Sequence, residues 1–146
     1  MPFARPVNLG VSRLGERVDM SDKAVEVATK FWLLMQSNDF RSVGAVLSDD
    51  FVLEWPQSKE RIRGRDNFAA MNEEYPANGR WDFTINRMIG NDNEAVSNVT
   101  VTDGVVTAQA LTFFTVKEEK IVEIVEYWPE SYEAVENRKH LVEPIK

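Results

Sequence analysis

Residues 113–130, FFTVKEEKIVEIVEYWPE, contain two alternating apolar runs separated by a short charged segment. Alternation of this kind places every second side chain on one face of a strand, and the charged residues 117–120 predict a tight turn. We therefore expect a β-hairpin. Its second strand ends on Glu126, Tyr127 and Trp128. A carboxylate beside two large aromatic side chains is typical of a proton-transferring group in an apolar cleft, or of an aromatic rim.

The same alternation recurs upstream of this hairpin. Residues 81–89 alternate between apolar and polar side chains, and Arg87 interrupts the apolar side. Residues 95–102 form the next expected strand, and the Asp-Gly pair at 103–104 predicts a hairpin turn. Residues 105–116 then form the second, antiparallel strand of that hairpin. Four long antiparallel strands are therefore predicted in the second half of the chain.

Helices are expected ahead of these strands. Ser21 is a suitable N-cap for a first helix, because apolar residues follow it at three- and four-residue steps. Asp39 can cap a short second helix, residues 51–55 alternate as a strand that Pro56 ends, and Asp66 can cap a third helix. Helices followed by antiparallel strands predict an α+β domain with the helices packed on one face of a curved sheet.

Composition narrows the class of protein. A chain of 146 residues fits one domain, which we place at residues 20–146, behind a flexible N-terminal arm at residues 1–19 that lacks periodicity. The net charge of −7 repels phosphate backbones, so no nucleic-acid partner is expected. No apolar run reaches the roughly 18 residues that a membrane span needs. With no cysteine and no signal-like segment, we expect a cytoplasmic protein.

The residue types of the chain do not indicate a cofactor-binding or metal-binding site. The chain has one histidine, His140, and no cysteine, so a transition-metal site is not expected. It also lacks an Asp-rich calcium loop, a glycine-rich phosphate cradle and a nucleophile elbow. We therefore expect no metal and no cofactor.

The order of these parts resembles the SnoaL-like branch of the nuclear transport factor 2 (NTF2-like) superfamily. The resemblance covers about residues 20 to 140 and rests on three segments: 62–66 (IRGRD), 120–128 (KIVEIVEYW), and the tail at 132–134 with Arg138. It implies a cone, in which the sheet wraps around the N-terminal helices and leaves an apolar pocket at one end. Relatives include polyketide cyclases, ketosteroid isomerases, epoxide hydrolases and dehydratases, as well as proteins with no known reaction.

The resemblance also implies partners and a pocket lining. A small apolar molecule, polyketide-like or steroid-like, would occupy the pocket, and dimers are common among the relatives, so we expect a homodimer. The expected ligand-binding residues are Trp32, Trp55, Phe68, Met71, Tyr75, Phe83, Arg87, Phe113 and Trp128. The alternative is that most of these side chains simply fill the core.

Two glutamates are the candidate catalytic residues. Alternation alone allows either Glu123 or Glu126 to point inward, and the resemblance favours Glu126, where related hydrolases and cyclases carry an acidic residue. Glu54 is the second candidate because it precedes Trp55 and Pro56, although a one-residue shift would place Trp55 in the cavity instead. Arg87 could pair with either carboxylate or hold an anionic group.

Two functions of different class follow. The first is cofactor-free acid/base chemistry, of the cyclase, isomerase or dehydratase type, with Glu126 and Glu54 moving protons. The second is a non-catalytic ligand-binding or protein-interaction module. Epoxide opening is not expected, because the Arg-x-Asp arrangement of the hydrolase relatives is missing. Steroid isomerisation is not expected either, because Trp55 stands where isomerase relatives carry an aspartate.

Overall fold

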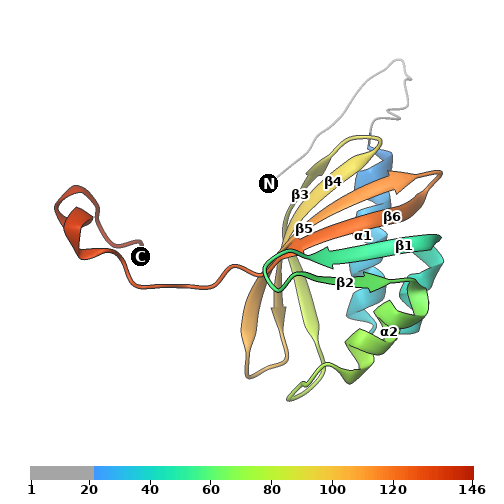
Figure 1. The fold of residues 1–146 in the computed structure, drawn as a ribbon, viewed down its shortest axis with the longest axis horizontal. Coiled ribbons are helices and arrows are strands. Elements are labelled where there is room, and N and C mark those ends of the chain that lie inside the picture. Colours follow the sequence, from blue (N-terminus) through green and yellow to red (C-terminus); the bar gives the residue numbers. More distant parts are fainter. Residues whose placement is uncertain (1–21) are drawn as a thin grey trace.

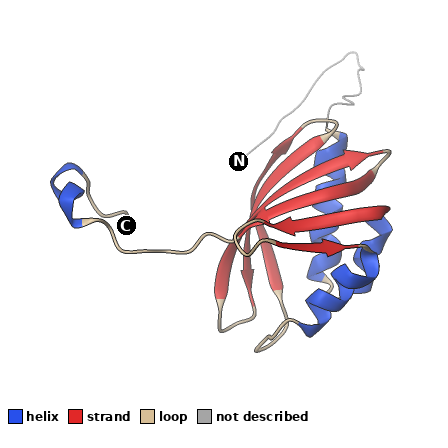
Figure 2. Cartoon of the chain, viewed as in Figure 1, coloured by secondary structure: helices blue, strands red, loops and turns tan. Residues whose placement is uncertain are grey.

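A computed structural model describes residues 22–146 of the protein, so the expected N-cap Ser21 and the arm at residues 1–19 lie outside the described residues. The elements in chain order are α1 (Lys23–Gln36), the 3₁₀ helix η1 (Phe40–Val46), β1 (Leu47–Trp55), β2 (Glu60–Arg63), α2 (Arg65–Glu74), β3 (Asp82–Gly90), β4 (Glu94–Thr102), β5 (Thr107–Lys117), β6 (Lys120–Tyr127) and the 3₁₀ helix η2 (Glu136–Leu141). A curved sheet forms one layer and the helices α1, η1 and α2 form the other (Figures 1 and 2). The α+β class is confirmed.

The six strands lie in the order β2-β1-β6-β5-β4-β3. Every neighbouring pair is antiparallel except β1 and β6, which run parallel. The first long strand of the chain therefore lies beside the last one, near the middle of the sheet. This pairing brings Trp55, at the end of β1, next to the end of β6.

Helix α1 covers the inner face of the sheet because its apolar residues recur at three- and four-residue steps. Its buried residues are Ala24, Val27, Ala28, Phe31, Trp32 and Met35. The helix packs against β3, β4, β5 and β6, whereas α2 packs against η1, β1 and β2. No helix within residues 22–146 is both long and apolar enough to cross a membrane.

Strand β3 carries a bulge that changes which residues face the core. Its register against β4 shifts between Ile85 and Arg87. Because side chains alternate with a period of two, one extra residue moves every later side chain to the other face. Met88 is therefore buried, and Arg87 and Ile89 are exposed. The prediction that Ile89 and Arg87 share the apolar side with Phe83 is wrong for this reason.

Strand β1 begins at Leu47, earlier than the expected strand at residues 51–55. The polar residues Ser48, Asp49 and Asp50 therefore lie in the strand. Leu47 pairs with Ile121 of β6 before the register shifts ahead of Val52. Pairing with β6, which is distant in the chain, thus extends β1 through residues 48–50, a polar segment whose sequence is typical of a turn.

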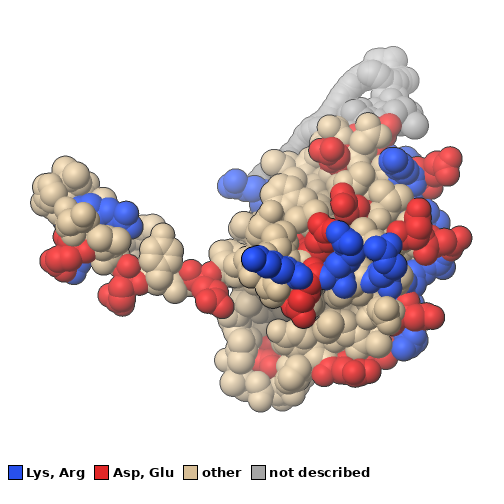
Figure 3. Space-filling view, viewed as in Figure 1, with Lys and Arg blue, Asp and Glu red and all other residues tan. Residues whose placement is uncertain are grey.

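The C-terminal residues 129–146 extend away from the rest of the molecule (Figure 1). We call this segment the C-terminal arm. It contains η2, and acidic side chains lie along it (Figure 3). No residue of η2 is buried.

Candidate active site

A row of polar side chains crosses the inner face of the sheet. Ser97 of β4 pairs in register with Thr112 of β5, which pairs in register with Glu126 of β6. All three are buried, with exposed fractions of 1%, 0% and 6%. Buried polar groups need hydrogen-bond partners, and the indole of Trp32 supplies one by donating to Ser97 Oγ at 3.0 Å.

Glu126 is the ionisable member of this row. Its Oε2 accepts a hydrogen bond from Thr112 Oγ1 at 2.7 Å, and its Oε1 accepts one from Trp55 Nε1 at 3.0 Å. Both donors are neutral, and among residues 22–146 no Lys, Arg or His forms an ion pair with Glu126. The carboxyl group is therefore held in place without a compensating positive charge.

The surroundings of Glu126 change its acidity. Burial raises the pKa of the carboxyl group, because the charged form loses its hydration. Hydrogen bonds from Trp55, Thr112 and Trp128 favour the charged form and offset only part of that rise. The group therefore takes up a proton more readily than an exposed glutamate does.

The alternation of β6 explains why Glu126 points inward. Ile124 and Glu126 are buried, whereas Glu123 and Val125 are half-buried and Tyr127 is exposed. Glu123 pairs in register with Thr115, on the outer face. Of the two glutamates that alternation left open, the structure turns Glu126 toward the core.

Glu54 lies on the opposite face of the sheet from Glu126. Its Oε2 accepts hydrogen bonds from Arg61 Nη2 at 2.6 Å and Arg61 Nε at 2.8 Å, and both side chains are partly exposed. The alternation of β1 turns Phe51, Leu53 and Trp55 inward and leaves Glu54 outward. The structure therefore does not bring the two candidate carboxylates together.

The predicted lining residues fall into three groups. Trp32 and Phe68 are buried in the aromatic core with Phe31, Phe51 and Phe114. The half-buried residues Trp55, Met71, Phe83 and Trp128 pack against that core. The exposed residues are Tyr75, Arg87 and Phe113, and Phe113 contacts Tyr127 edge to face on the outer face of the sheet.

Two surface hollows lie beside α2, one at the start of the helix and one along its side. One, of about 500 Å³, is lined by Asp49, Arg63, Gly64, Arg65, Asp66 and Asn67. The other, of about 670 Å³, lies between β2 and α2 and is lined by Arg61, Ile62, Arg63, Asn67, Ala70, Met71, Glu74, Tyr75 and Pro76. Neither hollow is lined by Glu126. Two of the predicted lining residues, Met71 and Tyr75, border the second hollow.

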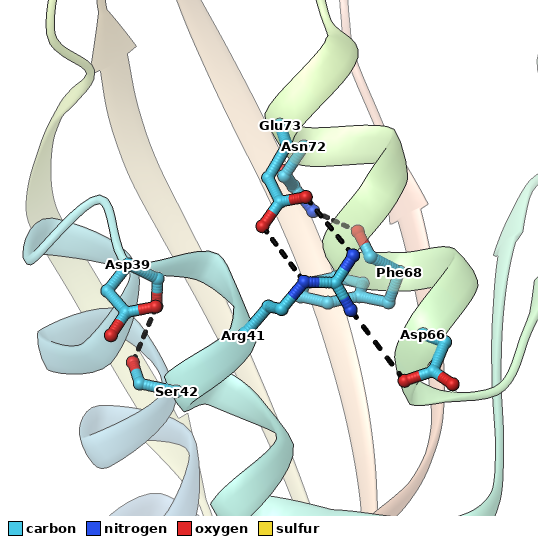
Figure 4. A network of polar contacts seen from close by, with 7 residues as sticks. All are labelled: Asp39, Arg41, Ser42, Asp66, Phe68, Asn72 and Glu73. Atoms are coloured by element: carbon cyan, nitrogen blue, oxygen red, sulfur yellow. Dashed lines mark hydrogen bonds and ion pairs between the residues drawn. The ribbon is translucent and has the colours of Figure 1, made fainter.

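An arginine bridge holds α2 against η1. Arg41 of η1 contacts Glu73 through Nε at 3.2 Å and Asp66 through Nη1 at 3.7 Å, so its guanidinium spans α2 from the first turn to the last (Figure 4). Asn72 donates to the Phe68 carbonyl at 2.8 Å within the same helix. These exposed contacts contribute little energy individually, but they orient α2 and with it Phe68 and Met71.

Sequence reasoning identified Asp103 only as a turn residue, and it has a larger structural role. Its carboxylate accepts hydrogen bonds from the backbone N–H groups of Asn78, Val105 and Val106 at 2.8 to 3.0 Å. These donors hold the pKa of Asp103 well below its ordinary value, the Asn78 N–H contributing most. Asp103 thus joins the β4–β5 turn to the loop before β3.

Other polar residues of the sheet differ in burial. Of the four residues Ser97, Asn98, Thr100 and Thr102 on β4, only Ser97 is buried. Thr112 was not singled out, although its position opposite Glu126 follows from the hairpin once the turn is placed. Within residues 22–146 no three His, Asp or Glu side chains are arranged to hold a metal ion.

Comparisons with known proteins agree with this fold. The SnoaL-like domain family matches residues 28–124, a region that ends before Glu126. A structure from Kribbella flavida, named as a candidate ketosteroid isomerase, shares 30% identity and a TM-score of 0.79, covering 87% of this chain and 94% of that one. No curated protein matches the chain.

Two more distant structures share the fold. An LEH-like epoxide hydrolase from M. tuberculosis is 23% identical with a TM-score of 0.61, covering 75% of this chain and 84% of that one. A candidate SnoaL-like polyketide cyclase from Jannaschia sp. is 15% identical with a TM-score of 0.64, covering 77% and 90%. The match over residues 28–124 and these shared folds show that the chain belongs to the SnoaL-like domain family, within the NTF2-like superfamily.

Proposed function

We propose that the protein is a cofactor-free enzyme that moves a proton on a small, largely apolar, oxygenated molecule, with Glu126 as the acid/base group. The observation that carries this proposal is a buried carboxyl group that accepts hydrogen bonds from neutral donors, Trp55 and Thr112 among them, with no cationic partner among the described residues. A carboxyl group whose pKa is raised by burial binds a removed proton more readily than an exposed glutamate does, and it can return that proton to the substrate.

The hydrogen bonds suit such a role. Trp55 and Thr112 each occupy one carboxyl oxygen, which fixes the orientation of the group and leaves lone pairs on both oxygens for a substrate proton. The half-buried rings of Trp55 and Trp128 offer an apolar surface beside the carboxyl group. Removal of a proton next to a carbonyl is the common first step of isomerisation, cyclisation and dehydration. The proton then returns to another carbon in isomerisation, to the new alkoxide oxygen in cyclisation, or to the departing hydroxyl group, which leaves as water, in dehydration.

The proposal includes a substrate class, an oligomeric state and a location for the protein. We expect an apolar, polyketide-like or steroid-like ketone, and a cytoplasmic homodimer. The Kribbella flavida protein, named as a candidate ketosteroid isomerase, supports chemistry at a carbon next to a carbonyl.

Deuterium exchange tests the proposal without knowledge of the natural substrate. Purified protein is incubated in D₂O with a panel of apolar cyclic ketones and enones, and deuterium uptake next to the carbonyl is followed by mass spectrometry. We expect the wild-type protein to accelerate uptake and Glu126→Gln to lower the rate by about 10²- to 10⁴-fold, the usual contribution of a general base. Glu123→Gln is the matched control, since it changes a glutamate on the same strand that faces outward.

Two results would contradict this proposal. Exchange that survives Glu126→Gln would remove the assigned role, and a wild-type protein that accelerates no exchange across the panel would contradict the reaction class.

A non-catalytic module is the second candidate. The observation that favours it is the dense aromatic packing of Phe31, Trp32, Phe68 and Phe114 on the inner face, together with two hollows that lie at α2 and are not lined by Glu126. For such a module we expect binding of the same ketones, measured by calorimetry, to be unaccompanied by deuterium uptake.

A further inference from the structure

The C-terminal arm is anchored to the molecule at one point. The backbone N–H of Trp128 donates to Gln57 Oε1 at 2.5 Å, and the Trp128 carbonyl accepts from Gln57 Nε2 at 3.1 Å. These bonds attach the start of the arm to the turn between β1 and β2. Among residues 22–146, no hydrogen bond or ion pair joins the arm to the body beyond this point. The arm then extends away from the sheet (Figure 1).

Large apolar side chains on this arm are exposed. Tyr132 is 82% exposed, Leu141 75% and Ile145 100%. Holding a segment extended costs conformational entropy, and exposing apolar side chains along it adds a further cost. Both costs are offset if the arm binds a protein surface.

The first half of the arm has a distinct charge pattern. Residues 129–136, PESYEAVE, carry three glutamates and no basic residue, with Tyr132 and Val135 between them. A complementary surface therefore needs basic groups beside an apolar floor. A short extended segment of this kind is suited to lie along the free edge of a sheet.

The hollow between β2 and α2 offers such a surface. Arg61 and Arg63 line it together with the apolar residues Ile62, Met71 and Tyr75. Glu74 is the one acidic residue of the lining, and Arg61 is paired with Glu54, so Arg63 carries the positive charge that is left for a partner. Basic side chains gather over this part of the molecule in Figure 3. In the part of the chain that the structure describes, β2 is also the edge strand of the sheet, and no strand there pairs with one side of its backbone. Within residues 22–146 no ion pair engages the Arg63 guanidinium.

We propose that residues 129–136 of one copy of this chain bind in the groove between β2 and α2 of a second copy, and that the second arm binds in return. Such reciprocal exchange is the isologous arrangement of a two-fold dimer. The inference rests on the homodimer proposed above and adds the segment and the surface that form it. It is independent of proton transfer at Glu126.

Cysteine crosslinking tests this contact cleanly because the natural chain has no cysteine. Val135→Cys places a thiol on the arm, and Tyr75→Cys places one in the groove. The two variants are co-expressed with different affinity tags, purified through both tags and oxidised. We expect a disulfide-linked dimer that contains one chain of each kind.

The matched control replaces the groove residue with a distant exposed one. Val105→Cys lies in the β4–β5 turn and is 74% exposed, so co-expression with Val135→Cys is expected to give no crosslink. Equal crosslinking in both pairs would overturn the proposal, as would its absence from the first pair. A disulfide that forms only within a single Val135→Cys/Tyr75→Cys chain would overturn it in favour of an arm that folds back on its own body.

Charge reversal gives a second, independent readout. Arg63→Glu places a like charge opposite the glutamates of the arm, and we expect the dimer dissociation constant from sedimentation equilibrium to rise by about tenfold or more. Lys117→Glu makes the same change at the β5–β6 turn and is expected to leave that constant unaltered. A dimer that Arg63→Glu does not weaken contradicts the groove, whereas a wild-type chain that sediments as a monomer contradicts the homodimer as well.

Discussion

At the scale of single residues, the unusual feature is a buried carboxyl group without a cation. Burying the charged form of Glu126 costs free energy because the carboxylate loses its hydration, and the hydrogen bonds from Trp55 and Thr112 offset only part of that cost. A leucine or methionine at this position would pack without that cost. Because a buried acid destabilises the fold relative to an apolar side chain, we infer that Glu126 has a role beyond packing. This inference is the basis of the proposed proton transfer.

The raised pKa of Glu126 makes the stability of the fold depend on pH. The folded state holds the proton more tightly than the unfolded state, so this group lowers stability as pH rises from the ordinary glutamate range through the raised pKa. Each unit of that rise corresponds to about 1.4 kcal/mol. We expect Glu126→Gln to be more stable than wild type at about pH 9, with the difference shrinking toward about pH 4.

Thermal unfolding across this pH range measures the effect. Glu123→Gln serves as the control, because it makes the same change at a half-buried glutamate on the outer face of the same strand. A Glu126→Gln variant whose Tm differs from wild type by the same amount at every pH would contradict the assigned acidity.

At the scale of elements, strand β5 shows how alternation divides the molecule into a core and a surface. Phe114 is 1% exposed and packs edge-on against Phe31, with ring centroids 5.3 Å apart. Its neighbour Phe113 is 44% exposed and contacts Tyr127 of β6 edge to face. Adjacent residues of one type therefore belong to opposite faces of the sheet.

This neighbouring pair allows a matched test. We expect Phe114→Ala to lower the free energy of unfolding by about 3–5 kcal/mol, because it leaves a cavity in the aromatic core. Phe113→Ala removes a ring that is already half in water and should cost less than about 1.5 kcal/mol. Urea denaturation measures both, and equal costs would show that the two faces are not divided as described.

At the scale of the whole molecule, the site depends on strands that are far apart in the chain. Glu126 lies on β6 and its donor Trp55 lies on β1, and only the parallel pairing of these strands brings them to 3.0 Å. Helix α1 then covers the same face of the sheet and excludes water from it. The acidity of Glu126 is therefore a product of the assembled sheet.

Removing one donor tests this dependence. Trp55→Phe keeps an aromatic ring and deletes the N–H, so the charged form of Glu126 loses a hydrogen bond and its pKa should rise further. We expect the pH at which the Glu126 carboxyl titrates, followed by ¹³C NMR, to move upward. Trp128→Phe deletes a second indole N–H and should act in the same direction. A downward shift in either variant would contradict the described hydrogen bonding.

Local patterns in the chain were enough to predict the class of fold. Alternation located the four long strands, helical spacing located α1, and the Asp-Gly pair located the β4–β5 turn. Each of these signals depends on neighbouring residues, so it survives without knowledge of the tertiary structure. The choice of Glu126 over Glu123 required the family resemblance, because both faces of β6 are nearly equally apolar.

Only the tertiary structure decided how these elements combine around the site. The bulge in β3 turned Arg87 outward, parallel pairing with β6 extended β1 back to Leu47, and folding placed Arg61 within ion-pair distance of Glu54. The buried row of Ser97, Thr112 and Glu126 depends on the register between three strands. Register and bulges are set by contacts between segments distant in the chain, and a shift of one residue reverses which side chains are buried.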